Sequence, residues 1–168
     1  MPAKRNVYLC QVNNKFGDNQ CFLPYSVGIL QAYAQSDPEV NEYYKFKGFF
    51  FLRDPIDEVV ARMDSPDCVG ISCYVWNFVY STALAKAIKQ IYPKCLIVLG
   101  GPHVPNRSEG FFQEHPYADV LIHGEGELAF TEVLKWRAGV LGKTELEILG
   151  ASFNKEGMAL KTPDRPRP

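Results

Sequence analysis

Short apolar runs alternate with longer stretches of helical periodicity along most of the chain. The runs cover residues 6–12, 43–52, 68–74, 96–99 and 120–122. Apolar residues recur at three- and four-residue spacing in the stretches between them, over 24–36, 55–63, 78–91, 108–114 and 127–137. Strands that alternate with helices indicate repeated βα units and a largely parallel sheet. The pattern therefore predicts an α/β fold with five parallel strands.

Proline and capping residues mark where helices begin. Pro24 opens the first helix, and Asp54 is the predicted N-cap of the second, with Pro55 at its first position. The first helix is expected to bury Val27, Ile29, Leu30, Tyr33 and Ala34. The third is expected to bury Leu84, Ala87, Ile88 and Ile91. The run at 68–74 is almost wholly apolar, which predicts a central strand covered on both faces.

The pattern changes after Gly142. Short runs on either side of a turn from Asn154 to Gly157 predict a β-hairpin at about residues 146–161. Residues 162–168 hold three prolines, so we expect a linker or exposed tail there. Because 168 residues is the size of one ordinary domain, we expect a single domain over residues 1–161.

Composition narrows the possible functions. The net charge is −1, so no overall field draws the chain to nucleic acid or anionic lipid. No apolar run approaches the roughly 20 residues that cross a bilayer, and no signal-peptide core follows the amino terminus, so we expect a cytoplasmic protein. The five cysteines form no CxxC or CxxxCxxC motif. Cys10, Cys73 and Cys95 lie in or beside apolar runs, which is typical of buried thiols.

Two predicted strands run directly into glycine-rich loops. Gly100-Gly101-Pro102-His103-Val104 follows one, and Gly124-Glu125-Gly126-Glu127 follows the other. Ligands bind at the carboxyl edge of open α/β sheets, where glycines let them approach the backbone. Tight turns also require glycine, and a helix dipole by itself favours glutamates at a helix start. Neither loop matches GxGxxG or the GxxxxGKS/T phosphate loop, so those two kinds of nucleotide binding are unsupported.

A third loop begins at the end of the run at 68–74. It carries the candidate residues Ser72, Tyr74, Val75, Trp76, Asn77 and Phe78. Its aromatic rings either stack on a flat ligand or plug the core at a helix entry, and Asn77 is equally a candidate helix cap. His103 is the histidine best placed at this edge, although a surface or capping role is the alternative. No Ser/His/Asp or Cys/His arrangement is present that would predict a catalytic centre.

Taken in order, Gly70-Ile71-Ser72, Gly100-Gly101-Pro102-His103 and Gly124-Glu125-Gly126-Glu127 resemble motifs of the amino-terminal cobalamin (B12)-binding domain of B12-dependent radical SAM proteins. The similarity covers residues 6–160. It implies a Rossmann-like, flavodoxin-like sheet of strand order 2-1-3-4-5. It also implies a corrin lying across the carboxyl edge and a nucleotide tail entering beside the central strands. The loops at 72–78, 100–104 and 124–127 then become the cobalamin-contacting positions.

Two departures from wider B12 patterns shape the expected function. Residues 13–20 contain no histidine and no DxHxxG motif, which favours base-off cobalamin without a protein histidine on cobalt. The CxxxCxxC motif that holds a 4Fe–4S cluster beside S-adenosylmethionine is also absent. The resemblance therefore implies a module that binds and positions cobalamin for a radical SAM domain or partner chain, of the methyltransferase type.

Two other functions fit the residues taken without the resemblance. One is a doubly wound interaction or regulatory domain without a ligand. The other is an enzyme that acts on an unrelated small molecule at the same sheet edge, because fold alone does not fix function.

Overall fold

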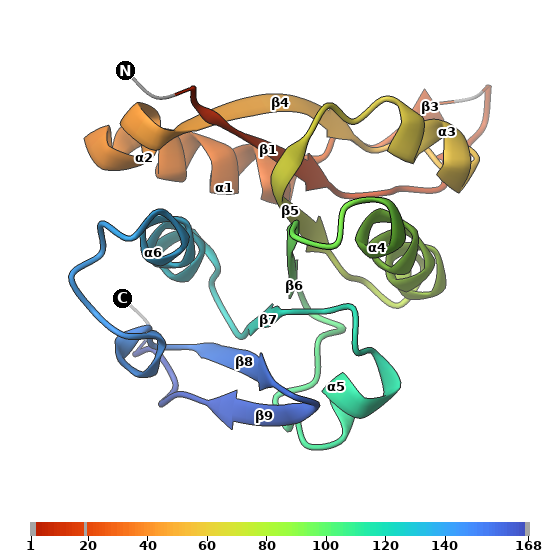
Figure 1. Ribbon diagram of the computed structural model, residues 1–168. Helices are drawn as coiled ribbons and strands as arrows, with labels where there is room; N and C mark the ends of the chain where they lie inside the picture. The colour runs from red at the N-terminus through yellow and green to blue at the C-terminus, as the bar shows by residue number, and fades with distance from the viewer. Residues whose placement is uncertain (1–2, 19, 167–168) are drawn as a thin grey trace.

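The computed structural model describes residues 3–18 and 20–166, which form one seven-stranded sheet between two groups of helices (Figure 1). The strands are β1 (Arg5–Cys10), β4 (Tyr44–Phe50), β5 (Pro66–Ser72), β6 (Leu96–Gly100), β7 (Val120–Ile122), β8 (Ala151–Lys155) and β9 (Met158–Lys161). Strands β4-β1-β5-β6-β7 are parallel, which matches the predicted order of the parallel strands. The hairpin β8–β9 joins the same sheet antiparallel, so the sheet has seven strands rather than five.

Helices cover both faces of the sheet (Figure 1). One face carries α1 (Tyr25–Ser36), α2 (Pro38–Tyr43) and α6 (Glu127–Ala138), and the other carries α3 (Ile56–Ala61), α4 (Phe78–Ile91) and α5 (Phe111–Glu114). Side chains alternate along β1, where Val7 and Leu9 enter one core cluster and Tyr8 and Cys10 enter the other. Within the described residues, no helix has both the length and the apolarity to cross a bilayer.

The predicted buried cysteines are confirmed. Cys10, Cys73 and Cys95 are buried free thiols. Burial raises the pKa of Cys73 and of Cys95 to about 12. Because the thiolate is the reactive form, these residues act as small core side chains.

Several element boundaries differ from the predicted ones. The strand expected at 68–74 runs from Pro66 to Ser72, and the one expected at 43–52 is preceded by α2. This six-residue helix begins where Asp37 Oδ1 accepts from the N–H groups of Glu39 and Val40, at 2.9 and 3.2 Å. It has no predicted counterpart because Asp37-Pro38 is typical of a helix end, and because Val40 is the one buried side chain of α2.

The second predicted helix begins one residue late. Helix α3 starts at Ile56, so Pro55 is its N-cap residue. Asp54 instead pairs with Arg62, with Oδ2 2.6 Å from Nη2. The helix expected over 108–114 starts at Phe111, after Gly110 with a φ of 79°.

Three of the predicted buried side chains are exposed. Ile29 and Tyr33 of α1 are 37% and 44% exposed because they face a cavity described below. Ile91 is 64% exposed at the last residue of α4. The loop after β1 also contains an unpredicted small hairpin, β2 (Lys15–Phe16) with β3 (Gln20–Cys21).

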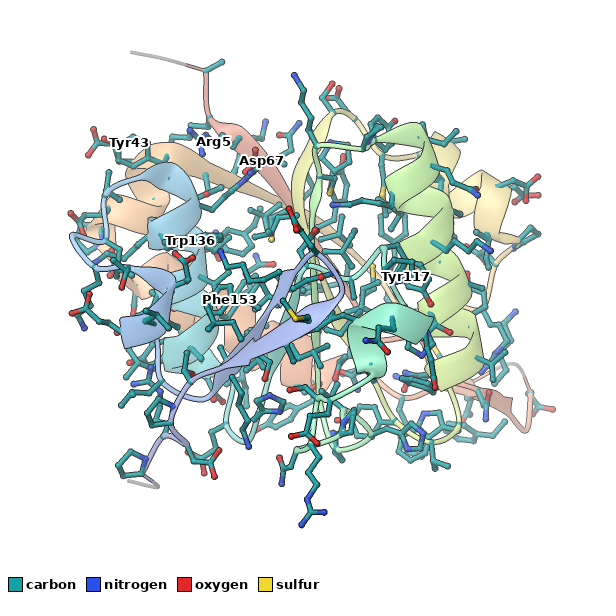
Figure 2. All side chains as sticks on the ribbon, turned by 60° about the horizontal axis from the view of Figure 1, so that its bottom comes forward. Arg5, Tyr43, Asp67, Tyr117, Trp136 and Phe153 are labelled. Carbon is teal, nitrogen blue, oxygen red and sulfur yellow. The ribbon has the colours of Figure 1, made fainter. Side chains whose placement is uncertain are left out.

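The C-terminal part packs closely on the domain. The short 3-10 helix η1 (Glu145–Glu147) precedes the hairpin, which therefore begins at Ala151 rather than near residue 146. Trp136 of α6 meets Phe153 of β8 with ring centroids 5.3 Å apart (Figure 2). Thr162 is buried, and its hydroxyl donates to the carbonyl of Ala151 at 3.0 Å. Part of the predicted linker at 162–168 is thus held against β8, while residues 167–168 lie outside the described residues.

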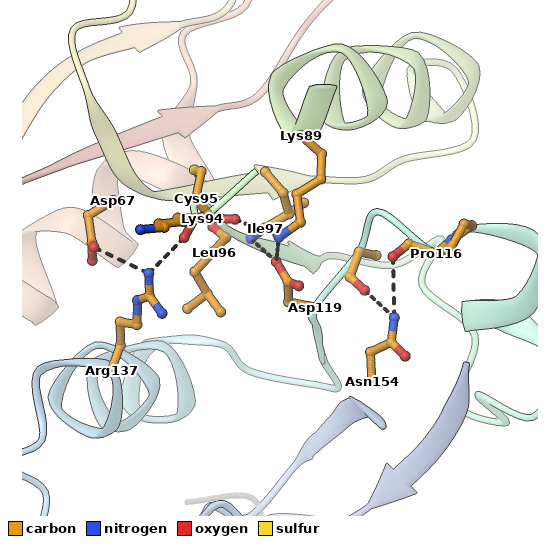
Figure 3. A network of polar contacts seen from close by, with 11 residues as sticks. Asp67, Lys89, Lys94, Cys95, Leu96, Ile97, Pro116, Asp119, Arg137 and Asn154 are labelled. Carbon is orange, nitrogen blue, oxygen red and sulfur yellow. Dashed lines mark hydrogen bonds and ion pairs between the residues drawn. The ribbon is translucent and has the colours of Figure 1, made fainter. Parts of the chain in front are cut away.

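A polar network joins the elements at the amino-terminal edge of the sheet (Figure 3). Asp119 Oδ2 accepts from Lys89 Nζ at 2.6 Å and from the N–H of Ile97 at 2.7 Å. Arg137 Nη2 donates to the carbonyl of Lys94 at 2.7 Å. These contacts bind α4, β6 and α6 together at the edge opposite the glycine-rich loops.

Candidate functional site

A cavity of about 350 Å³, here the first cavity, lies at the carboxyl edge of the sheet between β5, β6, β7 and helices α1 and α6. Strand β4 is added on one side of β1, and β5, β6 and β7 follow on the other. This reversal is the switch point at which open α/β sheets bind ligands. The cavity has the size of a small-molecule site. The sequence pattern therefore points to the edge at which the cavity lies.

The walls of the first cavity come from five elements. Its lining from the two helices is Tyr25, Ser26, Val27, Ile29, Leu30, Glu127 and Phe130. Its lining from the strands and the loops that follow them is Gly70, Ile71, Ser72, Tyr74, Val98, Gly100, Gly101, Pro102, Ile122, Gly124, Glu125 and Gly126. Most of this surface is apolar, which suits a flat or aromatic ligand group.

The glycines of this lining have different structural roles. A Cβ on Gly70 would lie 2.8 Å from Leu9 Cδ2 and 3.2 Å from Phe130 Cε2, so β5 has no space for a side chain there. Gly101 has a φ of 100°, and a Cβ on it would lie 2.7 Å from the carbonyl oxygen of Cys73. A Cβ on Gly100 would have no neighbour nearer than 3.8 Å. The turn therefore requires Gly101, whereas Gly100 leaves open space at the cavity wall.

Three hydroxyl groups meet in the first cavity. Ser26 Oγ lies 3.2 Å from Ser72 Oγ and 3.5 Å from the hydroxyl of Tyr74. Gln11, the residue after β1, accepts at Oε1 from Ser26 Oγ at 2.7 Å and from Ser26 N at 3.0 Å. The N-cap residue of α1, Pro24, makes no side-chain hydrogen bond, so Gln11 supplies the cap. Because Gln11 already accepts from the backbone N–H of Ser26, the start of α1 is not arranged as a phosphate site.

Nine of the predicted site residues line the first cavity. They are Ser72, Tyr74, Gly100, Gly101, Pro102, Gly124, Glu125, Gly126 and Glu127. Val75 and Trp76 follow on the same loop and are 72% and 49% exposed. The ring of Trp76 stacks on that of Tyr74, with centroids 4.5 Å apart and 14° between the planes. An aromatic surface therefore adjoins the cavity mouth.

Four predicted site residues pack within or against the fold and do not line the first cavity: Asn77, Phe78, His103 and Val104. Asn77 is fully buried, and its Nδ2 donates to the carbonyls of Val12 and Ser72 at 2.9 and 3.0 Å. It holds the loop in shape but makes no side-chain bond that caps α4. The exposed ring of His103 meets Phe78 edge-on at 4.7 Å. Val104 is buried.

A second cavity, of about 930 Å³, adjoins the first. The two share Ile29, Gly124, Glu125 and Glu127, and the second is also lined by Tyr33, His123, Leu128, Arg165 and Pro166. Arg165 forms an ion pair with Glu132 of α6. His123 Nε2 lies 2.8 Å from Ser152 Oγ, and burial lowers the pKa of this imidazole. His123 is therefore neutral at pH 7.

Gln11, Ser26 and Arg165 are site residues that the sequence motifs do not indicate. Gln11 interrupts an apolar strand and reads as a side chain facing solvent. Arg165 lies in the proline-containing tail, 33 residues from Glu132, so no local pattern indicates their contact. A polar residue near the carboxyl end of the predicted strand at 6–12 is the one usable signal, and it points to Gln11.

The fold and cavities define a doubly wound α/β domain with a ligand-sized site at the carboxyl edge of its sheet. Residues 29–134 match the B12 binding domain family. The chain belongs to this family and is a cobalamin-binding domain related to radical SAM methyltransferases.

Two curated relatives are similar over about two thirds of the chain. The cobalamin-dependent radical SAM methyltransferase TokK of Streptomyces tokunonensis is 47% identical over 69% of this chain and 17% of its own length. The 2-(S-pantetheinyl)-carbapenam-3-carboxylate methyltransferase of Streptantibioticus cattleyicolor is 49% identical over 67% of this chain and 17% of its own. The chain thus spans about a sixth of the length of these relatives.

Solved structures share the fold at low sequence identity. The cobalamin-dependent S-adenosylmethionine radical enzyme OxsB, with aqua-cobalamin and S-adenosylmethionine bound, matches 98% of this chain and 23% of its own with a TM-score of 0.73 and 15% identity. A cobalamin-binding protein from Desulfitobacterium hafniense matches 80% of this chain and 59% of its own, with a TM-score of 0.56 and 14% identity.

Proposed function

We propose that this domain holds cobalamin base-off, with the nucleotide tail in the first cavity and the corrin across the loops at the carboxyl edge. The observation that carries the proposal is the first cavity itself, an apolar slot at the switch point of a B12 binding domain. When bound, cobalamin supplies a cobalt centre that relays methyl groups. The residues of this chain bind the cofactor and set its orientation.

The residues of the first cavity fit an aromatic base on a polar tether. Leu30, Val98 and Phe130 offer apolar contact to the faces of a ring. Ser26 and Ser72 place hydroxyl groups beside that surface, where one of them can donate to a ring nitrogen. The missing side chain at Gly70 lets the ring of Phe130 lie directly against β5, where it forms part of the cavity wall.

We further propose that no histidine of this chain binds cobalt. The sequence has three histidines. The Nδ1 atom of His115 lies 2.7 Å from the hydroxyl of Tyr117, and His123 bonds Ser152. The ring of Tyr74 lines the first cavity and the ring of Trp76 stacks on it, so these rings would offer the corrin an apolar surface rather than a nitrogen ligand.

The domain is proposed to work with a radical SAM domain that carries a 4Fe–4S cluster and S-adenosylmethionine. Support comes from the relative TokK, a cobalamin-dependent radical SAM methyltransferase, and from the much greater length of both methyltransferase relatives. The part played by this chain is to present one face of the bound corrin at the open edge of the sheet.

Gel filtration after mixing with hydroxocobalamin tests the binding, and electron paramagnetic resonance tests the axial ligand. We expect the corrin absorption to co-elute with the protein. We also expect the reduced cob(II)alamin form to show cobalt hyperfine lines without splitting by an axial nitrogen. Loss of all colour from folded protein would favour the ligand-free interaction domain. Nitrogen splitting would show that an imidazole or the cofactor's own base remains on cobalt.

A further inference from the structure

The second cavity has a wall that none of the three loops provides. Tyr33 comes from α1, His123 from the end of β7, and Arg165 from the segment after β9. That segment is fixed in place, because Pro163 accepts at its carbonyl from the N–H of Gly150 at 2.8 Å. Arg165 Nη2 also donates to the carbonyl of Leu149 at 3.2 Å. The wall is therefore part of the folded domain.

The lining of the second cavity carries two carboxylates that are free to accept hydrogen bonds. Glu125 and Glu127 have no ion-pair partner within residues 3–18 and 20–166. Arg165 is paired with Glu132, which Lys143 also contacts. A ligand group that donates hydrogen bonds is therefore favoured beside the two glutamates.

The same lining also offers a donor to a carbonyl oxygen. Arg165 Nε is buried and has no hydrogen-bond partner in the described part of the chain. A buried N–H without an acceptor is unfavourable, so an oxygen that reached Arg165 would be bound favourably. Acceptors at Glu125 and Glu127 and a donor at Arg165 together suit one group, the primary carboxamide, which has two N–H donors and one carbonyl acceptor.

We propose that the second cavity binds carboxamide side chains along one edge of the corrin, with Glu125 and Glu127 accepting from amide N–H groups and Arg165 donating to an amide oxygen. The inference rests on the proposed function and adds Arg165 to the cofactor site. It divides the cofactor between the cavities, because the tail occupies the first and the ring edge contacts the second. A substitution in the first cavity should therefore weaken contacts with the nucleotide tail, and a substitution in the second should weaken contacts with the corrin ring.

Absorbance titrations with cobalamin and with cobinamide test this division. Cobinamide keeps amide side chains around its corrin but lacks the nucleotide tail. Arg165→Met should weaken binding of both ligands about tenfold, as expected for one hydrogen bond from a charged donor. Arg165→Lys keeps the charge beside Glu132 and should lose less. Ser72→Ala, the matched variant in the first cavity, should weaken cobalamin but leave cobinamide unchanged.

Two further measurements separate binding from folding. Arg165→Met leaves Glu132 without its partner, so the double variant with Glu132→Met removes both groups, and thermal melts compare the two proteins. We expect the double variant to keep the affinity loss. Cobalamin monocarboxylic acids, in which one amide is hydrolysed, should bind less well than cobalamin when the altered group lies at this wall. Changing Glu125 and Glu127 to glutamine should remove that difference.

The outcomes distinguish this inference from the function on which it rests. If wild-type protein binds cobalamin and the folded Arg165 variants bind both ligands as wild type does, the second cavity does not contact the ring edge. Weakening of cobalamin alone would place Arg165 against the tail and overturn the division. If wild-type protein binds neither ligand, the proposed function itself fails.

Discussion

Replacing Gly101 by alanine should destabilise the domain strongly, because backbone groups enclose this position. Cys73 donates its N–H to the carbonyl of Gly100 at 2.7 Å, and its own carbonyl accepts from the N–H of His103 at 3.1 Å. Gly101 also accepts from the N–H of Val104 at 3.1 Å. The loops after β5 and β6 are thus joined through their backbones at the first cavity.

Two costs add in Gly101→Ala. A residue with a side chain held at positive φ costs about 1–2 kcal/mol, and the φ of Gly101 is 100°. The new Cβ would lie 2.7 Å from Cys73 O and 2.9 Å from Cys73 N, which are backbone atoms with little freedom to move. Overpacking of this kind costs about 1–3 kcal/mol. The expected loss of about 2–5 kcal/mol is large against a total stability of about 5–15 kcal/mol.

Two neighbouring glycines are matched controls. Gly124→Ala carries only the conformational cost, because its φ is 70° and an added Cβ would have no atom within 4 Å, so we expect about 1–2 kcal/mol. Gly100→Ala carries neither cost and should change stability by less than about 0.5 kcal/mol. Urea denaturation followed by circular dichroism measures all three. If Gly101→Ala loses no more stability than Gly124→Ala, the close approach of the new Cβ to the backbone of Cys73 does not destabilise the domain, and the prediction is wrong.

Three further predictions test other parts of the structure. His103→Ala should weaken cobalamin binding several-fold at most, by about 0.5–1.5 kcal/mol, and leave the bound absorption bands in place; a shift of the bands would show that this ring reaches cobalt. Burial, followed by the charge of Lys161, lowers the pKa of His123 below 6.5, and Asp164 opposes this shift. Near pH 6.5 the unfolded chain therefore binds more protons than the folded domain. Folding stability should fall as the pH drops through about 6.5 toward the folded pKa, and urea midpoints should show a smaller fall in His123→Gln. Asp119→Ala leaves the N–H of Ile97 without its acceptor and should cost about 1–3 kcal/mol of stability. A change in the cobalamin affinity of the folded variant would contradict the placement of Asp119 at the edge opposite the cavities.

The sequence predicts the parallel strands because their apolar pattern is local and nearly continuous. Strand β7 matches its expected range of 120–122, and β6 extends one residue beyond 96–99. Helix α2 is not predicted because it follows α1 after a single residue, at Asp37, and begins with Pro38, which is typical of a helix end. Strand β8 joins the sheet beside β7, where Leu121 pairs with Ser152. The sequence does not predict this position, because the two strands are distant in the chain and no local pattern indicates their pairing.

The site is predictable only where glycine marks the backbone. The glycine-rich loops indicate the correct edge, but the sequence treats Gly100 and Gly101 alike, and only the φ angles and neighbours separate them. Asn77 is a candidate ligand contact by sequence, but the structure buries it fully and bonds its side chain to the backbone. Side-chain direction is set by the packing of distant segments, which sequence spacing alone does not give.

The path of the chain explains why the second cavity lies next to the first. Hairpin β8–β9 pairs with β7, so the segment after β9 returns toward the carboxyl end of β7, where His123 bonds the backbone of Gly150. Thr162 fixes this return at Ala151, and the ion pair to Glu132 then sets Arg165 beside the loop at 124–127. One wall of the proposed corrin site thus depends on a hairpin that the parallel sheet does not itself require. Ligand contact with Arg165 would stabilise that return by mass action, which couples the order of the C-terminal segment to cofactor binding.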